Sequence, residues 1–243
     1  MHNPVAHSAV SEALVKFATA PLADSAAQTA AGLAVSRARA SLAGARDAEQ
    51  KVAALLQSQG NVSNDARLRA WIVGAALTAQ APASTSTPVL AAVIAYGEKL
   101  SASEDEIAAA AAIGIEAAAR LLAAVDSQEF RARWNAASAV GVIGAVLAVS
   151  RLLKLDETRA QHALGIAATQ AAGLARNAGE PMAAIEIGKA AADAIEAALL
   201  AKHGFTSAPA SIDGRRGLAA LMAYRFDEAT ITEGLGARWS AHS

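Results

Sequence analysis

The sequence predicts an all-α protein that folds as one multi-helix domain. Its hydrophobic content is 54%, and this fraction comes mostly from alanine rather than from β-branched or aromatic residues. Alanine is the strongest intrinsic helix former, whereas valine, isoleucine, threonine and the aromatic residues favour strands. The 243 residues suit one large domain or two small ones, and a chain of this length can bury a core without disulfides.

Ten segments have the composition and boundary residues of helices. They cover residues 12–19, 25–42, 49–57, 65–79, 89–100, 104–124, 137–153, 157–171, 183–202 and 214–224. Ser103 and Glu106 form a capping-box pattern, in which each side chain can satisfy a free backbone amide at the helix start. Asp156 can cap the helix that follows it. Gly204 comes shortly after Lys202, the usual order at a helix end.

Composition and charge argue against several classes of partner. Cysteine is absent, which excludes disulfides and thiolate metal ligands and is compatible with a cytoplasmic protein. The net charge is -1 without long blocks of one sign, so we expect no nucleic-acid partner. The longest uncharged apolar run, between Arg133 and Arg151, is shorter than the roughly 20 residues that cross a bilayer, so we expect no membrane partner.

The first residues lack a secretory signal, and we expect a flexible N-terminus at 1–10, a helical domain at 11–239 and a tail at 240–243.

The five histidines form no metal-binding or catalytic pattern. His2, His7 and His242 lie near the ends, and His203 falls at a helix end, where a cation is favourable for electrostatic reasons. His162 lies within a predicted helix. The sequence also lacks an HExxH motif and a phosphate-binding glycine loop, so we expect no metal and no cofactor.

Several separate segments follow one another in the order of a known family. The central ones read WNAASAVGVIGAVLAVSRLLKLDETRAQHALGIAATQAAGL, IGKAAADAIEAALLAKHGFTSAP and IDGRRGL. Upstream lie RAWIVGAALTAQ, PVLAAVIAYGEKL and IGIEAAARL, the last ending in Arg120. Together, from about Ser11 to Trp239, they resemble the MmgE/PrpD family, which includes 2-methylcitrate dehydratase, cis-aconitate decarboxylase and iminodisuccinate epimerase.

The resemblance implies a large all-helical domain, followed in the family by a smaller α/β domain, with the active site in the cleft between them. This sequence ends in LGARWSAHS, about where the chain would cross into the small domain. We therefore expect the helical domain only. The resemblance also implies dimers formed through helical domains, so the expected partner is a second copy of the chain or a full-length family member.

The resemblance further implies that the usual catalytic residues are replaced. Thr78 stands in the helix that usually carries a His and acidic residues, and Ser84 stands where a His-Pro pair is expected. Asn135 begins the stretch that matches His-Pro-Thr, while Ala183 and Glu186 match a Lys and, three residues later, a His. The family chemistry is cofactor-free proton abstraction next to a carboxylate, which needs a base and cationic groups. We expect that chemistry to be lost.

Two polar residues near these positions, with Thr78, are the candidate catalytic groups. Glu186 and Lys189 are three residues apart, on one helix face, and close enough to pair. Glu186 fits either a solvated or ion-paired surface residue or an acid or base in a remodelled pocket, because perturbed carboxylates only point to sites statistically.

Four further residues are the candidate ligand-binding groups. Arg176 and Asn177 precede the helix that carries Glu186, where a long side chain and free amides could meet an anion. Arg176 fits a structural pairing as well as a ligand contact. Asn135 and Ser84 complete the set, and Asn135 also fits a buried hydrogen-bonding residue.

Three functional hypotheses follow. The preferred one is a pseudoenzyme, a catalytically diverged domain that serves as a binding or partner subunit. The second is an active, cofactor-independent lyase or isomerase that acts on a small carboxylate substrate with relocated groups. The third is a sensor that keeps only the anion-binding end of the cleft.

Overall fold

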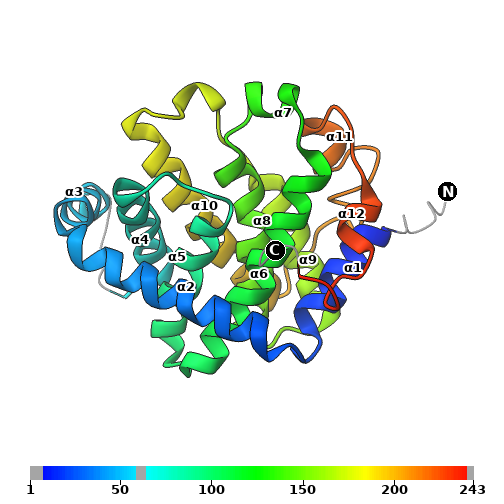
Figure 1. Cartoon of the computed structure of the whole chain (residues 1–243), viewed down its shortest axis with the longest axis horizontal. Helices are drawn as coiled ribbons and strands as arrows, with labels where there is room; N and C mark the ends of the chain where they lie inside the picture. Colours follow the sequence, from blue (N-terminus) through cyan, green and yellow to red (C-terminus); the bar gives the residue numbers. More distant parts are fainter. Residues whose placement is uncertain (1–7, 59–63, 240–243) are drawn as a thin grey trace.

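The computed structural model describes residues 8–58 and 64–239, and over these ranges the protein is all-α (Figure 1). The prediction of an all-α fold is confirmed. In this part of the chain the one β-type contact is an isolated antiparallel bridge between Trp134 and Leu174. The helices are α1 Ala9–Thr19, α2 Ser25–Gly44, α3 Arg46–Gln57, α4 Ala66–Gln80, α5 Ser86–Leu100, α6 Glu104–Val125, α7 Gln128–Arg133, α8 Ala136–Leu152, α9 Glu157–Gln170, the 3-10 helix η1 Ala175–Asn177, α10 Pro181–Lys202, α11 Leu218–Met222 and α12 Glu228–Thr232.

The long predicted helices are present, but the prediction for residues 214–224 is wrong in extent. Only Leu218–Met222 is helical there. The preceding residues form turns in which a Cβ atom at Gly214 would lie 2.9 Å from Cβ of Ala210, closer than real side chains approach. The short elements α7, η1 and α12 were not predicted, because they are too short for an apolar periodicity to develop.

The predicted helix caps form as the sequence indicates. The amide of Glu106 donates to Oγ of Ser103 at 3.2 Å, and the amide of Ser103 donates to Oε2 of Glu106 at 3.0 Å. Asp156 accepts from the amide of Arg159 at 2.8 Å. Gly204, with a φ of +92°, follows the end of α10 in the left-handed conformation that glycine adopts without strain.

Helix α8 runs through the middle of the molecule, beside α6 (Figure 1). All of residues 137–150 are buried, so α8 is apolar on every side rather than amphipathic. It packs closely against α6 because both helices carry glycine at the contact. A Cβ atom at Gly144 would lie 2.7 Å from the side chain of Ala118, so a larger residue would push the helices apart.

Helix α6 is long and apolar enough, by length and composition, to cross a membrane. Within the protein, 78% of its most apolar stretch is buried. This degree of burial is typical of the central helix of a folded helical domain.

Polar contacts attach the start of the described chain to the segment before α11. Asp213 accepts hydrogen bonds from the hydroxyl of Ser8 and, at 3.3 Å, from the amide of Val10. Helix α1 therefore begins at Ala9, before the expected domain boundary at residue 11, and Val10 is completely buried. The rest of the expected N-terminus, residues 1–7, and the expected tail, residues 240–243, lie outside the described residues.

Candidate functional site

A cavity of about 510 Å³ lies where α4, the start of α8, the segment after α9 and the first half of α10 meet. We call it the tryptophan cavity, because two of the three tryptophans of the chain line it. The lining residues used below are Trp71, Trp134, Gln170, Glu186, Lys189 and Asp193, together with the apolar Leu174, Met182 and Ile185.

One wall of the cavity depends on a glycine. Gly173 has a φ of +130°, and a Cβ atom there would collide with the hydroxyl of Ser138 on α8. Its carbonyl accepts a hydrogen bond from the amide of Asn135 at 3.0 Å. Gly173 therefore lets the segment after α9 lie directly on the start of α8, which places Trp134 and Leu174 at the cavity.

Three of the predicted site residues come together around one carboxylate. The side-chain amide of Asn135 donates to Oε2 of Glu186 at 3.2 Å, and that of Asn177 donates to Oε1 at 2.5 Å. Asn135 is fixed because its Oδ1 caps α8, accepting from the amide of Ala137 at 3.2 Å. Each oxygen of Glu186 thus accepts a hydrogen bond from an amide on another element.

The expected pairing of Glu186 with Lys189 does not form. Lys189 instead makes an ion pair with Asp193, one turn further along α10. Both spacings place side chains on one helix face, but the carboxylate of Glu186 is held by the two asparagine amides. The ammonium of Lys189 also lies 5.8 Å from the centre of the Trp71 ring, at the outer limit of a cation–π contact.

Asp193 is a site residue that the sequence prediction missed. Only 9% of its side chain is exposed, and burial raises its pKa while the Lys189 ammonium opposes that rise. Two signals were available in the sequence: the spacing of four from Lys189, and a carboxylate within an alanine-rich stretch that is otherwise apolar.

Three buried polar atoms of lining residues have no hydrogen-bond partner among the described residues. They are the indole Nε1 of Trp71, the indole Nε1 of Trp134 and Oε1 of Gln170. Buried polar groups are nearly always paired with protein, water or ligand. These three atoms are shielded from solvent, so they lie behind the cavity surface and not on it.

The other predicted site residues lie outside this cavity. The hydroxyl of Thr78 donates to the carbonyl of Gly74 within its own helix, at 2.8 Å. Ser84 is exposed and shares a hydrogen bond with the hydroxyl of Ser86 at 2.8 Å. Arg176 is exposed on η1 and is not among the lining residues.

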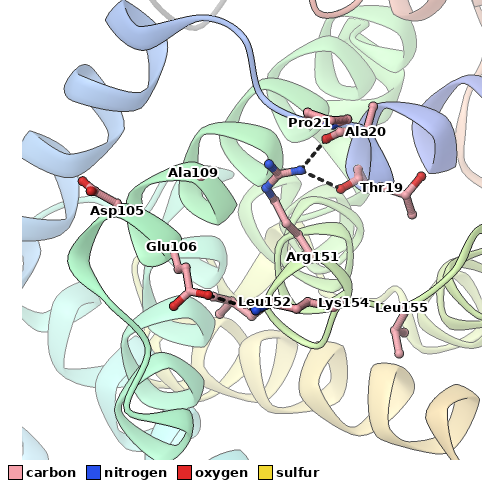
Figure 2. A pocket seen from close by; sticks show the side chains of 11 residues that line it. Thr19, Ala20, Pro21, Asp105, Glu106, Ala109, Arg151, Leu152, Lys154 and Leu155 are labelled. Atoms are coloured by element: carbon pink, nitrogen blue, oxygen red, sulfur yellow. Dashed lines mark hydrogen bonds and ion pairs between the residues drawn. The ribbon is translucent and has the colours of Figure 1, made fainter.

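A second cavity, of about 440 Å³, lies where the end of α1 meets the start of α6 and the end of α8. Figure 2 shows Arg151 reaching across it, donating to the carbonyl oxygens of Ala18 at 3.1 Å and Ala20 at 2.6 Å. Lys154 pairs with Glu106 at 3.2 Å. These charged groups join structural elements, so we interpret this cavity as structural.

Among residues 8–58 and 64–239, no three His, Cys, Asp or Glu side chains are grouped so that they could hold a metal ion. The expectation that the chain uses no metal or cofactor stays a prediction.

Comparison with known proteins places the chain in a family. The family model of the MmgE/PrpD N-terminal domain matches residues 3–229, a segment that includes every residue of the tryptophan cavity named above. The chain therefore belongs to the MmgE/PrpD family, as the resemblance predicted. Human cis-aconitate decarboxylase is 35% identical over 112 residues, a match that covers 46% of this chain and 23% of that enzyme.

Proposed function

We propose that this chain is a catalytically diverged MmgE/PrpD domain that binds a small molecule in the tryptophan cavity and serves as a binding or partner subunit. The observation that carries the proposal is that its candidate catalytic groups are already engaged. Glu186 is held by two asparagine amides, Lys189 by Asp193, and Thr78 by its own helix backbone. Each of these groups therefore already has a structural partner.

The residues at the family's reactive positions support the same proposal. The resemblance places Asn135, Ala183, Thr78 and Ser84 where imidazole or amine groups are expected. None of these four side chains ionises near neutral pH, so none supplies a general base or a cation.

A thermal-shift screen with a cavity-blocking variant tests the binding role. The probes are small di- and tricarboxylic acids and their amides, and a molecule that binds only the folded state raises the melting temperature. Met182 is 47% exposed at the cavity, so Met182→Trp fills the cavity with little effect on the core. We expect probes that stabilise the wild type to lose their effect in Met182→Trp.

The matched control is Leu221→Trp, because Leu221 is 70% exposed on α11 and does not line the cavity. It should respond to the probes as the wild type does. Equal stabilisation of both variants would contradict binding in the tryptophan cavity.

A second candidate function is a cofactor-independent lyase or isomerase. The specific observation in its favour is Asp193, a carboxyl group at the cavity whose pKa is raised by burial and which contacts Lys189. Such a pair can exchange a proton with a bound acid. Incubation with small carboxylic acids in deuterated water measures this exchange directly. The enzyme would be favoured over the binding subunit if the wild type exchanges protons and Asp193→Asn does not. The control variant Asp156→Asn should then exchange protons as the wild type does.

The partner role also rests on the family resemblance. We propose that the chain forms a homodimer or associates with a full-length family member. Sedimentation of the pure protein and co-purification from the native host test the two forms. Recovery as a free monomer in both experiments would contradict this part of the proposal.

A further inference from the structure

The tryptophan cavity carries more negative than positive charge. Glu186 and Asp193 are two carboxylates, and Lys189 is the one cation among the described residues that line the cavity. That cation is already paired with Asp193. Arg176, the other cation expected to meet a ligand, is not among the lining residues. A bound polycarboxylate would therefore meet two carboxylates and no uncommitted cation.

The remaining walls favour an apolar ligand body. The two indole rings lie at the same cavity as Leu174, Met182 and Ile185. Small-molecule sites commonly combine such apolar walls with a few polar groups that fix the orientation of the ligand. Aromatic rings also pack favourably against a second flat ring.

Building on the proposed binding role, we infer that the tryptophan cavity selects a small molecule without negative charge. Its ligand has an apolar, preferably flat body. Anionic ligands are disfavoured because they lose their hydration and approach Glu186 and Asp193. The ligand class therefore differs from the small carboxylate of the enzyme hypothesis.

Three probes of one shape and different charge test this inference: benzoate, benzamide and benzamidinium. Binding is measured by isothermal titration calorimetry with the whole chain. We expect benzamide and benzamidinium to bind at least about tenfold more tightly than benzoate, which corresponds to about 1.4 kcal/mol. Glu186→Gln should reduce the difference in affinity between benzoate and the other two probes, because it removes one negative charge from the cavity lining and keeps the shape of the side chain.

Two further variants separate charge from structure. Glu180→Gln makes the same chemical change at an exposed residue outside the lining and should leave the discrimination unchanged. Trp71→Phe keeps an aromatic wall and changes no charge, so it should leave the order of the three affinities unchanged.

The outcomes distinguish the inference from the function on which it rests. Tightest binding by benzoate would overturn the charge selection and leave the binding role intact. Binding of none of the three probes at millimolar concentration, together with a thermal-shift screen that finds no stabilising molecule, would overturn both.

Discussion

Asp193 lies between the apolar core and the ammonium of Lys189, and this environment makes its titration informative. Burial raises the pKa of Asp193 above its ordinary 3.8, because water stabilises the carboxylate better than the protein interior does. Between pH 3.8 and the native pKa, the folded protein binds more protons than the unfolded chain. The contribution of Asp193 to stability is therefore complete below pH 3.8 and is lost as the pH rises through the native pKa.

Replacing Asp193 with Asn should make the free energy of unfolding fall less steeply as the pH rises above 3.8. Urea denaturation at a series of pH values measures this slope. Asp156→Asn is the control, because the stability that Asp156 contributes depends on pH in the opposite direction. The amide of Arg159 lowers the pKa of Asp156, so this carboxylate stabilises the wild type above pH 3.8 and the benefit is lost on acidification. A steeper fall in Asp193→Asn would show that the pairing with Lys189 outweighs burial.

At the scale of elements, the contact between α4 and α10 positions the cavity. A Cβ atom at Gly74 would lie 2.8 Å from Cα of Gly188, so the two backbones touch. Gly188 also leaves room for Trp71, whose Cδ1 would be 2.6 Å from a Cβ atom there. Because α4 carries Trp71 and α10 carries Lys189 and Asp193, this close approach sets the distance between opposite cavity walls.

Gly188→Ala should therefore destabilise the protein by roughly 1–3 kcal/mol, since overpacking forces the helices apart. The same substitution at Gly32 is the control. A Cβ atom at Gly32 on α2 meets Cβ of Ala108 at 3.5 Å, an ordinary contact. Gly32→Ala should stabilise the protein by roughly 0.5–1 kcal/mol, because alanine is the better helix former. Denaturant unfolding of both variants checks the pair, and equal effects would contradict a tight α4–α10 contact.

At the scale of the whole molecule, one buried arginine ties the C-terminal segment to the core. Arg120 on α6 pairs with the fully buried Glu116 at 2.6 Å. Its Nη atoms donate to carbonyl oxygens that belong to the segment from α12 onward, namely those of Thr230, Ile231, Glu233, Gly234 and Arg238. This set of contacts holds a segment that has little helix of its own against the central helix.

Arg120→Met should destabilise the protein by about 3–5 kcal/mol, because it leaves Glu116 buried without its cation. Arg37→Met, at an exposed position on α2, should change stability by less than about 0.5 kcal/mol. Adding Glu116→Leu to Arg120→Met should recover part of the loss, since the double variant buries neither charge. Chemical denaturation measures the free energy of unfolding of all three variants. In Arg120→Met, limited proteolysis should cleave the segment from α12 onward earlier than in the wild type. A loss equal to that of Arg37→Met would contradict the anchoring role.

Local signals in the sequence predicted most of the fold. The alanine-rich composition predicted the all-α class, and Ser103 and Asp156 marked two helix starts, because caps depend on residues only a few positions apart. The prediction failed for residues 214–224, where glycine turns and long-range contacts shorten the helix. For the site, Glu186, Lys189, Asn135 and Asn177 were predicted and lie at or beside one cavity. The hydrogen bonds among these residues, and the pairing of Lys189 with Asp193, were not predicted.

By itself, the sequence determined the family, the helical class and the positions at which the family's reactive residues are expected, because these depend on residue order and local spacing. The tertiary structure alone decided that Asn135 and Asn177 bind Glu186, that Asp193 is buried beside Lys189, and that two tryptophans line one cavity. These contacts join residues from different helices. Their distances are set by backbone packing at glycines such as Gly173 and Gly188, which residue spacing along the chain does not encode.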